Sequence, residues 1–264
     1  MNVAESYEYL KLTSEESKDI LENIDFAILV IGSVEQHSKH LPLGTDIMIA
    51  EAIAKRVIEK ARENGISTVL LPPIYYGYSD EHTEFPGTIS IRSEILVGYL
   101  YDICASLAKN KVKRIFIING HGGNLGVLDI VSRKIGTDFG IFVFYLYPYI
   151  KEVSEILTSE IGGIGHAGEL ETSLFLYLYP ELVRRDKMTK EIPKQLNNLG
   201  TDSRTPKSVH FGWFKLNSMM TESGTVGDPL SGTPEKGKML LETVVNQIVN
   251  ALKELKEINN LKKK

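Results

Sequence analysis

Five of the six histidines in this chain lie in predicted loops that also carry glutamate, aspartate, glycine or proline. They are His37, His40, His82, His121 and His166. A single histidine is usually a surface or packing residue, but several of them just after predicted strands indicate a common site. Imidazole together with carboxylate is a ligand set that suits zinc, manganese or iron. We therefore expect a divalent-metal centre, whose chemistry would be the activation of water for hydrolysis.

Three candidate ligands follow one predicted strand. Glu35 and His37 are two positions apart, so in an extended segment their side chains point the same way. Asp46 opens the next predicted helix, where by itself it would be explained as a cap or as a partner of the helix dipole. Beside Glu35 and His37, a carboxylate that bridges two cations is the better explanation.

His121 follows another predicted strand, within the segment Asn-Gly-His-Gly-Gly-Asn of residues 119–124. Its glycine neighbours let the backbone come close to a ligand, which makes Gly122 a candidate substrate contact. The alternative explanation is a tight turn in which Asn124 caps the next helix. The two explanations are compatible.

His166 stands shortly before Glu169 and Glu171, which open an apolar run. Two carboxylates near the start of a helix often only complement its dipole. A histidine so close to them favours proton transfer or metal ligation, so these three residues are the candidate catalytic residues.

Short β-branched runs alternate with longer amphipathic runs, which is the pattern of parallel strands connected by helices. The runs that predict strands are residues 26–31, 68–71, 114–118 and 141–146. Helices are expected around residues 47–58, from a cap at Ser93, from Leu125, and from a cap at Thr233, with Pro234 at the first position, to about Ile258. The predicted fold is α/β, a three-layer α/β/α arrangement with a mostly parallel central sheet.

In an open sheet of this kind, ligands bind beyond the carboxyl ends of the strands. The loops that carry Glu35 and His121 both follow predicted strands, so both belong at that edge. Residues 181–226 are expected to form surface loops. Because no repeat or linker divides the chain, we expect one domain over residues 1–264.

Composition excludes several classes of function. Apolar residues make up 42% of the 264 residues, yet no stretch approaches the run of about 20 that a membrane helix needs. The net charge is −4, and the dense basic cluster at residues 262–264 is an ordinary charged end, so no nucleic-acid partner is expected. The single cysteine, Cys104, and the absence of a secretory signal pattern indicate a cytoplasmic protein.

Several segments, taken in order, resemble the creatininase (creatinine amidohydrolase) family. They are residues 32–37 (GSVEQH), 40–46 (HLPLGTD), 76–79, 85–88, 119–124, 166–173 and 227–229. The resemblance spans about residues 26–250 and implies the creatininase-like α/β/α fold. The residues that match metal ligands of the family are Glu35, His37, Asp46 and His121. The resemblance also implies that Asp46 bridges two cations and that His166 transfers protons.

This chain departs from the family at two places. Many members have Gly-Pro where it has Ser38-Lys39, which alters a loop beside the site without touching a ligand. Creatininase itself has a glutamate ligand two residues after the histidine that His121 matches, and here that position is Gly123. Glu171 is the first candidate to replace the missing ligand, and Glu169 is the second.

The resemblance implies a hydrolase that uses two divalent cations, zinc, manganese or iron, to cleave a C–N bond in a small molecule. Tyr78, His82 and Phe85 lie in the motif expected to shape the pocket. Family members that share the glycine pair include a formamide deformylase of flavin and deazaflavin biosynthesis and a peptide-trimming enzyme, so the substrate stays open.

A dinuclear phosphoesterase is a weaker alternative because no arginine cluster accompanies the ligands, and a non-catalytic metal-binding or ligand-binding protein is the alternative from another class. A homo-oligomer is also implied, with a hexamer as the first candidate.

Overall fold

A computed structural model describes residues 6–147, 151–159, 164–192, 215 and 221–258. Its centre is one sheet of five parallel strands in the order β1-β3-β2-β4-β5. The strands are β1 (Ser6–Glu8), β2 (Phe26–Ile31), β3 (Thr68–Leu70), β4 (Arg114–Asn119) and β5 (Phe142–Leu146). The four predicted strands are confirmed to within one residue at each end, and β1 is a short edge strand that the sequence pattern did not predict.

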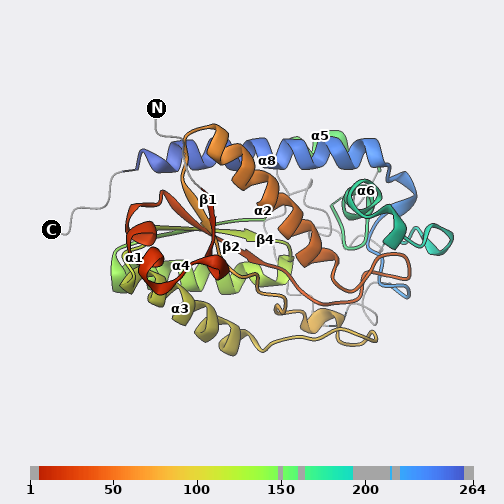
Figure 1. Ribbon diagram of the computed structural model, residues 1–264. Coiled ribbons are helices and arrows are strands. Elements are labelled where there is room, and N and C mark those ends of the chain that lie inside the picture. Colours follow the sequence, from red (N-terminus) through yellow and green to blue (C-terminus); the bar gives the residue numbers. More distant parts are fainter. Residues whose placement is uncertain (1–5, 148–150, 160–163, 193–214, 216–220, 259–264) are drawn as a thin grey trace.

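Helices cover both faces of the sheet, as the α/β prediction required. One face carries α2 (Thr45–Glu63), α5 (Lys151–Ile156) and α8 (Pro234–Lys256), and the other carries α3 (Ser93–Lys109) and α4 (Leu125–Phe139) (Figure 1). The short helix α1 (Ser14–Asn23) precedes β2, and α6 (Glu169–Leu178) packs against α8. No helix in the described part of the chain has both the length and the apolar composition needed to cross a membrane.

Strand β2 is buried at all six positions because helices lie on both sides of it. Phe26, Ile28 and Val30 face the core under α2 and α8, while Leu29 and Ile31 face the core under α3 and α4. This alternation follows from the two-residue period of a strand. It explains why β2 is a continuous apolar run rather than an alternating one.

The helix starts test the predicted caps. Thr233 caps α8, since its hydroxyl accepts a hydrogen bond from Lys236 N and Pro234 is the first helical residue, as predicted. The prediction of Ser93 as a cap is wrong, because Ser93 is already helical and Arg92 holds the cap position. The Asn124 side chain also makes no cap bond; it accepts from Tyr78 N and donates to Gly32 O instead, which ties two loops together.

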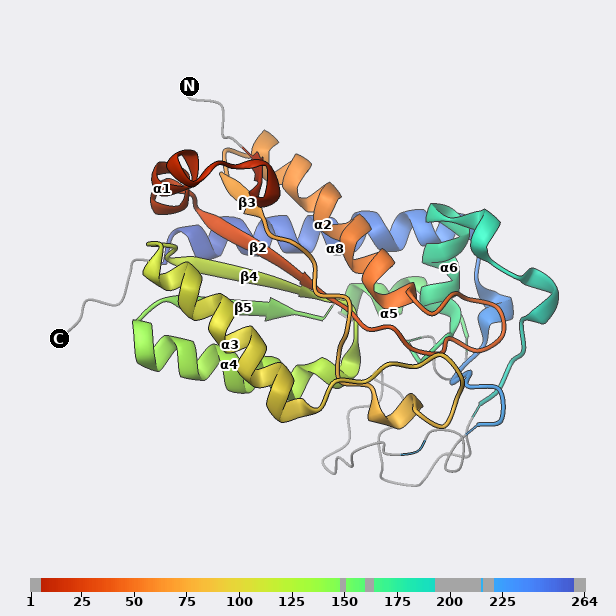
Figure 2. The ribbon, with the colours of Figure 1, turned by 60° about the horizontal axis from the view of Figure 1, so that its bottom comes forward.

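The connection between β2 and β3 runs over one face, through α2, and the connection between β3 and β4 runs over the other, through α3. Strands β3 and β4 therefore lie on opposite sides of β2 in the sheet. The loops that follow β2 and β4 diverge from each other at the carboxyl edge (Figure 2). Such a switch point is where α/β sheets bind ligands.

Candidate metal centre

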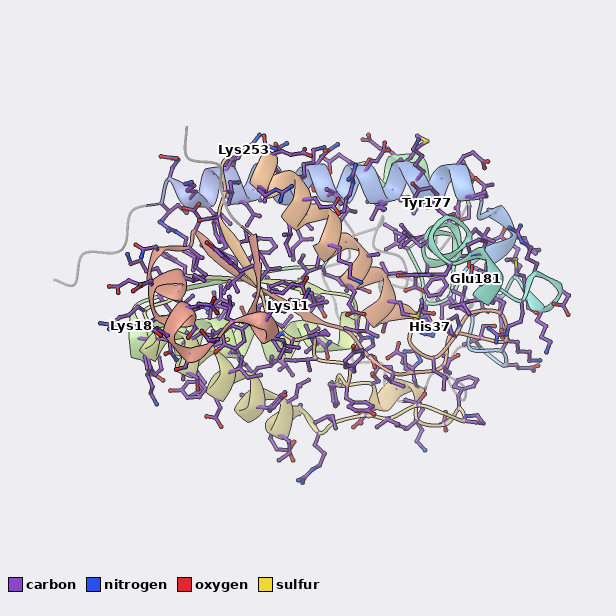
Figure 3. All side chains as sticks on the ribbon, in the orientation of Figure 1. Lys11, Lys18, His37, Tyr177, Glu181 and Lys253 are labelled. Carbon is purple, nitrogen blue, oxygen red and sulfur yellow. The ribbon has the colours of Figure 1, made fainter. Side chains whose placement is uncertain are left out.

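The loop after β2 supplies three side chains to the carboxyl edge. Glu35 and His37 are fully buried in that loop, and Asp46 lies in the first turn of α2 with 3% of its surface exposed. Figure 3 shows His37 near the N-terminal end of α2, at the opposite end of the molecule from Lys18. Buried charged groups are costly unless they are paired, so their position calls for opposite charge nearby.

His121, which directly follows β4, lies between two of these carboxylates. Its Nδ1 atom is 3.2 Å from Glu35 Oε2 and 3.3 Å from Asp46 Oδ2. Its Nε2 atom is 2.9 Å from the carbonyl oxygen of Tyr78, which holds the ring in this orientation. Glu35, Asp46 and His121 form a first group with one potential ligand atom each, mutually within 4.8 Å.

A second group forms on the other side of Asp46. His37 Nε2 is 3.1 Å from Asp46 Oδ1 and 3.8 Å from Glu171 Oε2. His37, His166 and Glu171 again offer three ligand atoms within 4.8 Å of one another. The two oxygens of Asp46 therefore face different groups, which is the arrangement that a bridging carboxylate requires.

A third group involves His82. His82 Nε2 is 3.2 Å and His166 Nδ1 is 3.5 Å from Glu35 Oε1, and these three residues also offer ligand atoms within 4.8 Å. The rings of His82 and His166 are 4.1 Å apart between centroids. The structure thus places His82, which the sequence suggested only as a pocket residue, among the charged groups of the site.

The two candidate glutamates at the start of α6 have different surroundings. Glu171 accepts a hydrogen bond of 2.6 Å from Ala167 N and belongs to the second group. Glu169 accepts hydrogen bonds from Thr158 N at 3.0 Å and Ser159 N at 2.8 Å, and pairs with Lys236. Its carboxylate therefore connects α6 to the preceding turn and to α8, and it is absent from the three described groups.

Gly123 has no room for a side chain. A Cβ atom there would collide with the carbonyl oxygen of Tyr78 and would lie 2.5 Å from His121 Nε2 and 3.1 Å from Glu81 Oε1. The missing family ligand is thus excluded by the local packing. The structure brings Glu171 to the second of the ligand groups instead.

The predicted pocket residues lie at the edge of this centre. The Tyr78 side chain packs on the core under α3 and α4, and its carbonyl oxygen is the part that contacts His121. Phe85 is half-buried and its backbone N–H donates to His82 O at 3.0 Å. Gly122 lies near the hydroxyl of Tyr147, which a Cβ would approach to 3.4 Å.

His40 is not part of the cluster. It is fully buried, and its Nε2 atom is 3.0 Å from the hydroxyl oxygen of Thr172. Burial lowers its pKa to about 4, so this imidazole is neutral. The His40 side chain therefore packs the loop after β2 against α6.

Sequence reasoning gave no role to Gln36 and Glu81. The Gln36 side-chain amide lies between His82 and His166, and Glu81 Oε1 is 3.7 Å from His121 Nε2. Both residues precede a candidate histidine directly, and this adjacency was the available signal.

The charges within the cluster shift its pKa values in opposite directions. Burial raises the pKa of Glu35, but the imidazoles of His121, His82 and His166 lower it to well below its ordinary value. Burial opposes charge on His37 as well, yet Asp46 and Glu171 raise its pKa to about 9. The pKa of His121 is raised well above its ordinary value by Glu35 and Asp46, against the effect of burial.

The other two imidazoles are neutral. Burial lowers the pKa of His82 to about 4. Burial, followed by the charges of His82 and His37, lowers the pKa of His166 well below its ordinary value. Neutral imidazole is the form that can accept a proton or bind a metal.

The residues present fit a pair of divalent cations. Three buried carboxylates, Glu35, Asp46 and Glu171, share one cluster. Among the described residues, both oxygens of Glu35 and the Oδ2 atom of Asp46 accept no well-directed hydrogen bond. The unsatisfied carboxylate oxygens of Glu35 and Asp46 are best satisfied by cations, and carboxylate together with imidazole suits zinc, manganese or iron. Fold and site thus define an α/β protein with a candidate dinuclear metal centre at the switch point of its sheet.

Comparison with known proteins gives the family. The family model for creatininase, creatinine amidohydrolase, matches residues 10–252. A mycofactocin precursor peptide peptidase of Mycobacterium tuberculosis is 31% identical over 229 residues, which cover 84% of this chain and 82% of the relative. The creatinine amidohydrolase of Pseudomonas putida is 29% identical over 246 residues, covering 86% and 88%.

Solved structures agree with these relatives. A creatininase structure with Mn superimposes with a TM-score of 0.77 and 26% identity, covering 96% of this chain and all of that one. The chain belongs to the creatininase family, whose characterised members are hydrolases. The predicted fold class and the predicted family are therefore confirmed.

Proposed function

We propose that this protein is a dinuclear metal-dependent amidohydrolase that cleaves a C–N bond in a small substrate. The observation that carries the proposal is the position of Asp46, whose two oxygens face two different ligand groups. Oδ1 is 3.1 Å from His37, and Oδ2 is 3.3 Å from His121. A carboxylate in this position can hold two cations next to each other.

The first and second groups, together with the contact of Asp46 Oδ1 with His37, suggest how the ligands divide once His166 is kept as the proton carrier. Glu35, Asp46 and His121 would hold one cation, and His37, Asp46 and Glu171 would hold the other. Glu171 thereby supplies the carboxylate that Gly123 lacks. Bound cations would polarise the substrate carbonyl and activate water, which is the chemistry that such pairs supply.

His166 is proposed as the proton carrier. Its Nε2 atom is 2.6 Å from the carbonyl oxygen of Gln36, which orients the ring, and its Nδ1 atom faces the cluster 3.5 Å from Glu35 Oε1. Because its pKa is lowered, this imidazole is neutral at pH 7 and can accept a proton at Nδ1. It would pass that proton to the departing nitrogen.

The relatives indicate three candidate substrate classes. Their names describe action on creatinine, on a peptide and on a formamidopyrimidine. The absence of a side chain at Gly123 separates this site from that of creatininase, so we favour a formamide or a short peptide over creatinine. Manganese and zinc, which solved creatininases contain, are the first metals to test, followed by iron.

We propose that one domain over residues 1–264 carries the activity, in a cytoplasmic homo-oligomer. The buried free thiol of Cys104 fits a reducing compartment, because it needs no disulfide partner. A non-catalytic metal-binding protein on the same scaffold is disfavoured by His166, which faces the ligand groups.

One screen tests the proposed function. Protein reconstituted with Mn²⁺, Zn²⁺ or Fe²⁺ is assayed against creatinine, formamidopyrimidines and short peptides, with Asp46→Ala as the inactive control. Metal-dependent ring opening of creatinine, release of formate from a formamidopyrimidine, or release of an amino acid from a short peptide would support it. Folded, metal-loaded protein that is inert towards all three classes would favour the non-catalytic alternative.

A further inference from the structure

The side-chain amide of Gln36 lies between two imidazoles of the metal centre. Its Nε2 atom is 2.9 Å from His82 Nδ1 and 3.0 Å from His166 Nε2. Gln36 is buried, with 3% of its surface exposed. A buried amide with fixed partners can decide which nitrogen of a neighbouring imidazole carries the hydrogen.

The orientation of this amide follows from Ser38. The backbone N–H of Ser38 can only donate, and it lies 2.8 Å from Gln36 Oε1, so this atom is the oxygen. Gly224 presses on the other side of the amide, where a Cβ would collide with Oε1. The amide nitrogen therefore faces His82.

The hydrogen of His82 is fixed by this contact. Nδ1 accepts from the Gln36 amide, so it cannot carry a hydrogen itself. The hydrogen of the neutral ring must be on Nε2, which faces Glu35 Oε1 at 3.2 Å. A nitrogen that carries a hydrogen has no lone pair for a cation.

The backbone of Gln36 fixes the second imidazole. The carbonyl oxygen of Gln36 can only accept, and His166 Nε2 lies 2.6 Å from it. The hydrogen of His166 is therefore on Nε2, and Nδ1 is left with its lone pair towards the ligand groups. The second amide hydrogen of Gln36 points instead towards the carbonyl oxygen of Gly224, at 3.4 Å.

We propose that Gln36 is a positioning residue that fixes the tautomers of both imidazoles, through its side chain for His82 and through its backbone carbonyl for His166. His82 then carries its hydrogen on Nε2, which lies 3.2 Å from Glu35 Oε1 without a well-directed hydrogen bond, and it is not a metal ligand, although the distances alone would allow it. His166 presents a free Nδ1 to the centre. This inference rests on the proposed function, because the tautomers decide which imidazole nitrogens are available to the cations. The tautomers themselves can be measured in protein without metal.

The direct test reads the tautomers. Protein labelled with ¹⁵N-histidine and stripped of metal is examined by long-range ¹H–¹⁵N spectra at pH 8, with His82→Gln and His166→Gln to assign the signals. We expect both rings to carry their hydrogen on Nε2. A hydrogen on Nδ1 of His82 in the parent protein would overturn the proposal.

A substitution separates the two contacts of Gln36. Gln36→Glu replaces the amide donor by an acceptor, so His82 Nδ1 should gain a hydrogen while His166 is unchanged, since the backbone carbonyl remains. Gln247→Glu on α8, where Gln247 contacts Glu152 at the surface, adds the same charge away from the site and should alter neither ring. If Nδ1 of His82 stays bare in Gln36→Glu, the tautomer is set by Glu35 alone and Gln36 has no such role.

Metal counting gives an independent readout. His82→Gln should retain as many cations per chain as the parent protein, with affinity reduced about tenfold through the loss of the contact to Glu35. His121→Gln, the matched change at a proposed ligand, should lose one cation. Loss of a cation in His82→Gln would overturn the proposal. A parent protein that binds no cation would refute the proposed function, and the spectra would still decide the role of Gln36.

Discussion

At the scale of single residues, Glu171 and Glu169 provide a matched pair, because they are two positions apart on α6 and both are buried. We expect Glu171→Gln to lose one of two cations, since an amide oxygen is a poorer ligand than a carboxylate. Glu169→Gln should keep both cations and instead lower the free energy of unfolding by about 1–3 kcal/mol, because Lys236 loses its charged partner. Chelator titration and urea unfolding measure the two effects. The opposite pattern would reverse the assignment.

His166 gives the prediction for proton transfer. Once a substrate is known, His166→Ala should retain metal and fold but lose about 10² to 10⁴ in kcat, the usual contribution of a positioned acid or base. Metal analysis and steady-state kinetics on the same sample check it. Loss of a cation would make His166 a ligand, and unchanged turnover would assign proton delivery to another group.

His40 makes stability depend on pH. Its pKa is about 4 in the folded protein and ordinarily 6.5, so the unfolded chain takes up a proton at a higher pH than the folded chain does. The free energy of unfolding should therefore fall as the pH drops below 6.5, by about 2 kcal/mol at pH 5 from this group alone. Urea unfolding of metal-free His40→Gln and parent protein at pH 7 and pH 5 isolates the difference, since other groups are shared. Equal losses in both proteins would contradict it.

At the scale of elements, four of the five parallel strands of the described sheet were predictable from their sequence, and the edge strand β1 was not. The strand Phe26–Ile31 is apolar at every position, and such a run indicates a buried strand without any knowledge of its neighbours. Strand β1 has three residues and exists because it pairs with β3, which no local pattern reveals. Helix α1 was not predicted either, although the sequence carries a signal for its start, the capping box of Thr13 and Glu16.

The site residues also divide into those whose position the sequence predicts and those whose position it does not. Residues in the loops that follow strands, such as Glu35 and His121, could be placed at one sheet edge from topology. The choice between Glu169 and Glu171 could not, because it depends on Lys236, which lies far along the chain and packs beside α6 only in the folded molecule. Spacing identifies candidates, and long-range packing selects among them.

The contact between α6 and α8 yields an element-scale prediction. A Cβ at Gly237 of α8 would collide with the backbone carbonyl of Ser173 on α6. Gly237→Ala should therefore cost about 1–3 kcal/mol of stability and, by displacing α6, weaken the cation that Glu171 holds. Gly98→Ala on α3, where a Cβ meets open space, should instead gain about 0.5–1 kcal/mol. Thermal unfolding and metal titration compare the two variants, and equal effects would refute the packing argument.

At the scale of the whole molecule, the metal centre links segments that are far apart in sequence, from Glu35 to Glu171. Cations that bind only the folded chain should stabilise it by about 2.7 kcal/mol for each site held at a hundred times its Kd. Chelation should lower Tm by about 5–10 °C per cation. In Asp46→Ala, which removes the bridge, Tm should no longer respond to added metal. Calorimetry with and without chelator tests this, and a Tm of the parent protein indifferent to chelator would argue against the centre.

The packing around Gly123 also limits how this family can exchange one activity for another. A glutamate cannot enter at that position in one step, because the Tyr78 carbonyl and the His121 ring already occupy the space. The loop that carries Tyr78 would have to retreat first, and until then the change would be harmful while Glu171 still served as the ligand. The two ligand arrangements are therefore separated by an epistatic barrier. Lineages on either side would diversify their substrates without crossing it.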